Sequence, residues 1–365
     1  MRRLAGLAIV LGILALFVVV PYISVGTYGI FRSDLDNPGT LQLLGLMFVF
    51  GAVALTYDLL FGYTGLLSFG HALYFAIGVY VMAIAMTDWD LGFYEAVAVT
   101  AAAGLVVPLL LGAVSLRVGG IAFAMVTLAF AEAGSVIARS NPGDLTGGEE
   151  GTPVDYEALP DAFVGVLNTK NLYWLALGYL AVVVALVYWA VDSSPGRYWQ
   201  AIRENEQRVE VLGAQPFRYK LLVFVFAAFL ATLGGVVYVL LIGTATPQVT
   251  TASFTLTLLL MVVIGGAGTL WGAVVGGMLY TFLDYRLTDW ADSEGVQALP
   301  SVLSTPLSQP LFVLGTLFIL LVVFLPGGLA GLTGLRRRGG GLTALEEAVG
   351  LERTHGGIEE EEATI

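Results

Sequence analysis

The sequence predicts an all-α integral membrane protein, and two observations carry this prediction: its composition and the length of its apolar runs. Of the 365 residues, 57% are hydrophobic and only 12% are charged, whereas a soluble domain carries about 25% charged residues. The hydrophobic residues gather in runs close to the roughly 20 residues that a helix needs to cross a bilayer. Because the hydrocarbon layer offers backbone groups no water, we expect these runs to be helices.

Ten apolar segments follow one another along the chain, which predicts about ten transmembrane helices. They span residues 4–23, 41–60, 65–86, 93–115, 120–138, 171–191, 220–242, 253–265, 269–286 and 309–325. The first resembles a signal peptide, but its apolar run is too long and no small-residue cleavage site is evident, so we expect a membrane helix there. Gly-rich stretches at 65–78 and 265–277 suggest two inverted halves of five helices, a common transporter plan.

The distribution of basic residues predicts the orientation, because cytoplasmic loops are enriched in Arg and Lys. With Arg2 and Arg3 inside, Arg117, the 192–219 loop and the 336–338 cluster also fall inside, while the loops 139–170 and 287–308 fall outside. We therefore expect a multi-pass plasma-membrane protein with both termini in the cytoplasm. Residues 1–335 form its transmembrane domain, and 336–365 form an acidic cytoplasmic tail that is expected to be disordered.

The formal net charge is -12, and Lys170 and Lys220 are the only lysines. Such an acidic surplus favours a halophilic prokaryote, because Asp and Glu aid solubility most; compositional drift is the alternative. The lack of a basic patch argues against nucleic-acid binding. With no cysteine and two histidines, we expect no metal site.

The loop at 193–220 reads SSPGRYWQAIRENEQRVEVLGAQPFRYK and is longer than a simple connection requires. Ser194 could cap a helix that begins at Pro195, the residues from 198 to 212 favour helix, and Gly213 is a natural stop. This predicts a docking surface for a cytoplasmic partner. The alternative is an amphipathic helix on the membrane surface, which would prefer a more basic polar face.

This loop resembles the coupling segment of ABC-importer permeases, in particular the LivM type of branched-chain amino-acid permease. It matches at Gly196, Arg197, residues 201–206 (AIRENE), Arg208, Glu210, Leu212, Gly213, Tyr219 and Lys220. Further matches follow in order at 63–72 (YTGLLSFGHA), 126–132 (VTLAFAE), 146–148 (TGG) with Gly151, 264–272 (IGGAGTLWG) and 324–329 (FLPGGL). The matches run in order along the chain, from about residue 57 to 335.

The resemblance implies an importer subunit that translocates leucine, isoleucine and valine into the cell. Its partners would be two ABC ATPases, a second homologous permease and an extracytoplasmic substrate-binding protein, together with the lipid of the membrane. The residues expected to couple to the ATPases are Arg203, Glu204, Asn205, Glu206, Arg208, Glu210 and Gly213. Urea or short-chain amides are alternative substrates, since they are carried by permeases of similar sequence.

No phosphate-binding motif G-x-x-x-x-G-K-[ST] occurs, since neither lysine follows a glycine. We therefore expect that the chain is not an enzyme and holds no cofactor, and that partner subunits bind ATP and Mg²⁺. An ion-coupled secondary transporter is a second alternative, but it expects carboxylates deep in the bundle, and only Glu132 is a fair candidate. An intramembrane enzyme is disfavoured because no nucleophile–base pair is visible.

Polar residues within apolar segments are candidates for a translocation path. We single out His71, Thr127 and Glu132; the alternatives are a structural hydrogen bond for His71 and pairing with Arg139 for Glu132. Asp58 lies near a segment end, as Asp284 does, and is expected at the membrane interface.

In the outer loop, three residues are candidates for docking of the binding protein, because a glycine turn allows close backbone approach. They are Thr146, Gly147 and Gly148. The alternative is an ordinary turn.

Overall fold

The computed structural model describes residues 17–22, 34–165, 168–291, 308–325 and 327–332. Most of the first predicted segment, most of the loop 287–308 and the whole acidic tail lie outside these residues. The longer helices are α2 (Pro38–Asp58), α3 (His71–Thr87), α4 (Phe93–Ser115), α5 (Gly120–Ser140), α6 (Thr169–Asp192), α9 (Pro216–Ile242), α10 (Ala252–Gly265), α11 (Leu270–Ala291) and α14 (Pro310–Phe324).

The remaining elements are short. They are the helices α7 (Ser194–Glu204), α8 (Glu206–Val211) and α15 (Gly328–Leu332), the π-helical turn η2 (Leu59–Tyr63), and the 3-10 turns η1 (Val20–Tyr22), η3 (Pro142–Asp144), η4 (Asp161–Phe163) and η6 (Pro247–Thr250). Two short strands, β1 (Thr152–Pro153) and β2 (Thr244–Ala245), pair antiparallel, with Thr152 opposite Ala245.

The helices confirm an all-α membrane protein. Five helical stretches in the described residues are long and apolar enough to cross a membrane, namely residues 38–63 and helices α4, α5, α6 and α9. The helices α3 and α10 are shorter, with 17 and 14 residues. Each of the nine later predicted segments coincides with one of the longer helices.

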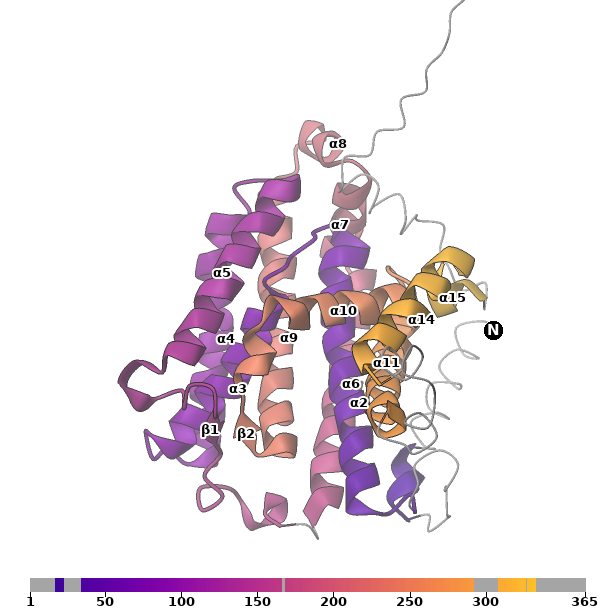
Figure 1. The fold of residues 1–365 in the computed structure, drawn as a ribbon. Helices are drawn as coiled ribbons and strands as arrows, with labels where there is room; N and C mark the ends of the chain where they lie inside the picture. The colour runs from indigo at the N-terminus through magenta and orange to yellow at the C-terminus, as the bar shows by residue number, and fades with distance from the viewer. Residues whose placement is uncertain (1–16, 23–33, 166–167, 292–307, 326, 333–365) are drawn as a thin grey trace, which may run out of the picture.

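One predicted span is interrupted. The segment expected at 65–86 is helical only from His71, because the preceding residues 65–70 form no helix. This segment, 64–70, runs from the end of α2 back into the bundle before α3 starts (Figure 1). The helix α10 likewise follows a non-helical stretch after α9, and it runs crosswise to its neighbours (Figure 1).

Helices α2 and α9 form the centre of the bundle. Helix α2 packs mainly on α6 and α11, and α9 packs mainly on α3 and α4. The most apolar window of α2 is 83% buried and that of α9 is 67% buried, against 22% for α4. The outer helices instead expose apolar side chains such as Leu110, Val136 and Trp189, as expected of surfaces that face lipid.

Glycines let the central helices touch. A Cβ atom on Gly78 of α3 would collide with the carbonyl oxygen of Thr232 on α9, and one on Gly235 would collide with that of Phe75. Small residues allow such close backbone approach between membrane helices.

The two ends of the bundle carry different loops. The helices α7 and α8 lie at the same end as the turn between α4 and α5, and the strands β1 and β2 lie at the opposite end (Figure 1). The turn between α4 and α5 contains Arg117. The basic 192–219 loop and Arg117 therefore share one end, and the acidic 139–170 loop occupies the other. Which end is cytoplasmic stays a prediction.

Candidate functional site

The loop between α6 and α9 contains two helices rather than the single one that the sequence suggests. Ser193, and not Ser194, caps α7, because its side chain accepts a hydrogen bond of 3.4 Å from the backbone nitrogen of Gly196. At Asn205 the backbone becomes extended, and the Asn205 side chain caps α8 by accepting from the backbone nitrogen of Arg208 at 2.9 Å. Gly213, with φ of 86°, follows α8.

Both short helices are anchored to the start of α9. The indole nitrogen of Trp199 donates to the carbonyl oxygen of Tyr219 at 2.9 Å, and the Tyr219 ring stacks on Tyr198. The Lys220 ammonium donates to the carboxylate of Glu206 at 2.6 Å. The predicted coupling residue Glu206 therefore holds α8 against the bundle.

The other side of the loop is exposed. We call Arg208, Glu210, Val211 and Leu212 the α8 tip. Val211 and Leu212 are 88% and 86% exposed, and the two charged residues beside them are exposed as well. Val209, two residues before Val211, is instead buried. An exposed apolar pair rimmed by charges is a typical protein-contact surface.

The remaining predicted coupling residues divide between the surface and the interior. Glu204, Asn205 and Gly213 are exposed. Arg203 is half-buried and turns towards the bundle, where its guanidinium donates to the carbonyl oxygen of Gly62.

The non-helical segment 64–70 is held by hydroxyl groups from two other helices. The backbone nitrogen of Phe69 donates to the Thr127 hydroxyl of α5 at 3.1 Å. The backbone nitrogen of Ala72, in the first turn of α3, donates to the Thr255 hydroxyl of α10 at 3.0 Å. Backbone outside a helix is tolerated at membrane depth only where protein or water satisfies it. Thr127, predicted as a path residue, therefore supports this segment.

His71 lies wholly inside the protein, where it links α2 and α3. Its Nε2 atom is 2.9 Å from the hydroxyl oxygen of Thr56. The Thr56 hydroxyl donates to the carbonyl oxygen of Val53 at 2.7 Å, so its oxygen accepts from Nε2, which assigns the proton to that nitrogen. This geometry fits the structural alternative, an interhelical hydrogen bond.

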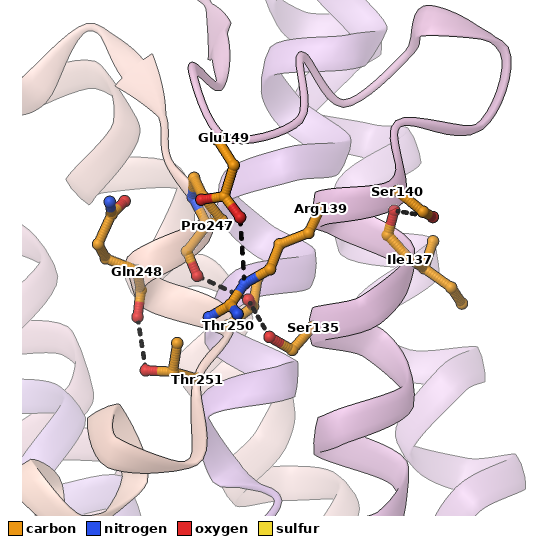
Figure 2. A network of polar contacts seen from close by, with 9 residues as sticks. All are labelled: Ser135, Ile137, Arg139, Ser140, Glu149, Pro247, Gln248, Thr250 and Thr251. Atoms are coloured by element: carbon orange, nitrogen blue, oxygen red, sulfur yellow. Dashed lines mark hydrogen bonds and ion pairs between the residues drawn. The ribbon is translucent and has the colours of Figure 1, made fainter.

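Glu132 has the opposite environment. It is exposed on α5, together with Met125 and Val136. Arg139 does not pair with it but lies 3.9 Å from the Glu149 carboxylate (Figure 2). No residue in the described part of the chain forms an ion pair with Glu132. A carboxylate on a helix that crosses the membrane is expected to face a water-filled path or a partner.

The buried side of α5 contacts the chain that precedes α10. The hydroxyl oxygens of Ser135 and Thr250 lie 3.1 Å apart, and the Thr250 hydroxyl donates to the carbonyl oxygen of Pro247 at 2.7 Å (Figure 2). The nearby Arg139–Glu149 pair contributes little stability, because both side chains are well exposed. Helix α5 thus contacts both the non-helical segment 64–70 and the 3-10 turn η6 before α10.

The glycine turn of the outer loop packs on its own chain. The side-chain Oδ1 atom of Asn141 accepts from the backbone nitrogens of Thr146 and Gly147, at 2.9 and 3.0 Å. Thr146 and Gly148 are buried, and a Cβ atom on Gly147 would collide with the carbonyl oxygen of Gly151. Of the three predicted docking residues, only the half-buried Gly147 reaches the surface.

The exposed side chains of this loop include the acids Asp144, Glu149, Glu150, Glu157 and Asp161. The sequence offered no signal for the ordering role of Asn141, whose left-handed backbone with φ of 48° is uncommon outside glycine.

Comparison with known proteins places this arrangement in a family. Residues 39–334 match the family model described as the permease component of the branched-chain amino acid transport system. The high-affinity branched-chain amino acid transport system permease protein LivM of Escherichia coli strain K12 is 25% identical, with 81% of this chain and 71% of that protein covered. The LivM protein of Salmonella typhimurium strain LT2 is 24% identical over the same shares.

No solved structure matches the chain significantly. The family model, however, covers most of the sequence and includes both broken spans and the loop with the α8 tip. The protein belongs to the family of permease components of branched-chain amino acid transport systems.

Proposed function

We propose that this chain is the membrane-spanning subunit of an ATP-driven importer for leucine, isoleucine and valine. It works with two ATPases that bind ATP and Mg²⁺, a second homologous permease and an extracytoplasmic substrate-binding protein. The observation that carries the proposal is the α8 tip, an exposed apolar pair on an anchored loop in a chain of this family. Neither the family nor the two relatives favours a urea permease or an ion-coupled transporter.

The α8 tip is the surface that the ATPase binds. Anchoring by Trp199 and Lys220 makes the loop rigid, so that a push on the tip reaches α9 instead of bending the loop. Its apolar pair is large enough to fill a groove in a partner, and the flanking charges fit the polar rim of an interface. The end with α7 and α8 is then cytoplasmic, both termini lie inside, and the outer loop faces the binding protein.

The exposed face of α5 lies against the second permease and lines the path between the two. Glu132 supports this assignment, because the face is otherwise apolar and a carboxylate on lipid would be costly. The path is selective for the substrate only in part, since the binding protein delivers the amino acid. The acidic surplus supports a halophilic prokaryotic source.

The bundle consists of two inverted halves with ten crossings in all. Three features support this: α2 packs on α10 and α11 as α9 packs on α4 and α3, each central helix is followed by a non-helical stretch, and each stretch leads into a short helix. Broken helices at corresponding positions are the usual sign of inverted transporter repeats.

The test uses the complex reconstituted in proteoliposomes. Val211→Glu with Leu212→Glu should abolish co-purification of the ATPases and ATP-dependent leucine uptake. Val118→Glu is the matched control: Val118 lies in the turn between α4 and α5 at the same end and is 40% exposed. Full ATPase binding by the double variant would reject the docking role. Uptake of labelled urea in preference to leucine would reject the substrate.

A further inference from the structure

A carboxylate is buried where the coupling loop meets the bundle. Asp58, expected at the membrane interface, lies near the end of its span but wholly inside the protein. Its Oδ1 atom accepts a hydrogen bond of 2.8 Å from the backbone nitrogen of Gly268, in the turn between α10 and α11. Its Oδ2 atom has no hydrogen-bond partner among the described residues. A buried carboxylate of this kind needs a compensating positive charge nearby.

Arg203 of α7 supplies that charge. Its guanidinium lies beside the turn that bonds Asp58, and it donates to the carbonyl oxygen of Gly62 in the π-helical turn η2. A Cβ atom on Gly268 would lie 3.1 Å from both the Arg203 Nη1 atom and the Gly62 oxygen. Helix α7, the turn η2 and the turn between α10 and α11 are far apart in sequence, and they meet at the Arg203 guanidinium.

Glycines leave the space in which Arg203, Asp58 and the Gly268 turn come together. A Cβ atom on Gly62 would collide with both the Asp58 carboxylate and the Gly268 nitrogen, and one on Gly65 would lie 3.2 Å from the Arg203 side chain. A residue larger than glycine at position 62 would push η2 away from the turn between α10 and α11. Arg203 is one of the predicted coupling residues, and these contacts of its side chain lie within the chain.

The contacts of Arg203 with Gly62 and with Gly268 connect it to the two interrupted spans. The turn η2 continues directly into the non-helical segment 64–70, and the Gly268 turn ends the crosswise helix α10. π-Helical turns occur frequently at functional sites. A shift of α7 would thus pull on both broken spans through one side chain.

We propose that Arg203 is a positioning residue that transmits movement of α7 to the segment 64–70 and to α10, through Gly62 and Asp58. This rests on the proposed function, in which the ATPases move the coupling loop. It goes further by naming the internal link, which is separate from the α8 tip that touches the ATPase.

The first experiment measures leucine uptake per ATP hydrolysed by the reconstituted complex. Arg203→Met should keep the ATPases bound and active but lower this ratio about tenfold, a change typical of coupling between two sites. Arg203→Lys, which keeps the charge, should recover part of the ratio. Arg197→Met is the matched control, because Arg197 lies exposed on the same helix and, among the residues that the structure describes, its side chain bonds Ser194 alone. A normal ratio in Arg203→Met would overturn the proposal.

A second variant separates transmission from folding. Asp58→Asn keeps an oxygen that can accept from Gly268 but removes the charge, so Asp58→Asn with Arg203→Met leaves no unpaired buried charge. We expect this double variant to fold and bind the ATPases as the unaltered chain does, yet to keep the low ratio. Recovery of the full ratio in the double variant would mean that Arg203 only neutralises Asp58, and it would overturn the proposal.

A third measurement follows the movement itself. The chain has no cysteine, so Leu256→Cys, at a position of α10 that is 47% exposed, is a unique thiol. Its labelling rate should change when a non-hydrolysable ATP analogue binds the complex, and Arg203→Met should abolish that change. A change that persists in Arg203→Met overturns this inference alone. Failure of the unaltered permease to bind ATPases overturns the proposed function as well.

Discussion

Replacing Thr127 or Thr255 with valine removes a hydroxyl that holds the non-helical segment 64–70 and keeps the shape of the side chain. Both side chains are at most 1% exposed, so water cannot replace the lost acceptor. The backbone nitrogens of Phe69 and Ala72 would be left without partners. We expect each substitution to destabilise the bundle.

Two estimates bracket the size of the effect. A buried donor without an acceptor costs about 1–3 kcal/mol in soluble proteins. Interhelical hydrogen bonds in a membrane protein average only about 0.6 kcal/mol, with a maximum near 1.7, because the unfolded chain in the membrane also finds partners. The upper part of the membrane range applies here, since Phe69 lies outside any helix. We therefore expect about 1–2 kcal/mol for each substitution, and less than the sum for both together because they hold one segment.

The assay is unfolding by SDS in mixed micelles, followed by fluorescence of the six tryptophans. Thr→Ser at either site keeps the hydroxyl and should lie near the unaltered chain. Thr316→Val is the matched control, because Thr316 is exposed and its hydroxyl bonds only its own helix. If Thr255→Val is no more destabilising than Thr316→Val, the hydroxyl does not support the segment and the reasoning is wrong.

Three other expectations concern packing, capping and charge. Gly78→Ala forces a methyl group against a carbonyl of α9 and should lower the free energy of unfolding by about 1–3 kcal/mol in the same SDS titration. Gly315→Ala should be neutral, because no described atom lies within 4 Å of the added one. Equal effects of the two substitutions would contradict this. Asn205→Ala removes the cap of α8 and should cost about 1 kcal/mol locally, seen as faster amide exchange in α8 alone. Lys220→Met should cost less than about 1 kcal/mol, because the half-exposed Glu206 can turn to water; a larger loss would show that the pair is needed for folding.

Membrane class and helix positions could be predicted from the sequence because insertion depends on a local property. Most of a helix such as Pro216–Ile242 is apolar, whatever the rest of the chain does. The helical nature of the coupling loop was also readable, since Pro195 and Gly213 act on neighbouring residues. The capping residue was displaced by one position, from Ser194 to Ser193, which lies within what local patterns can resolve.

The positions at which helices are interrupted could not be predicted from the sequence, because they depend on hydrogen-bond partners far away in the chain. The segment 64–70 and the first turn of α3 after it are bonded by hydroxyls that lie 58 and 183 residues away in the sequence. The break at Asn205 needs a side chain that caps one helix where another ends. Only the folded chain brings these acceptors to the donors.

The hydrogen-bond partners of the polar residues could not be predicted from the sequence either. The sequence by itself determined that this chain is a bundle of membrane helices with the coupling motif of its family, since both are written in contiguous residues. Only the tertiary structure decided that Arg203 and Asp58 reach the same turn inside the bundle, that His71 bonds a neighbouring helix and Thr127 the segment 64–70, and that Glu132 faces outward. The physical reason is that hydrophobicity belongs to a run of residues, whereas the partner of a polar group depends on which helices pack side by side.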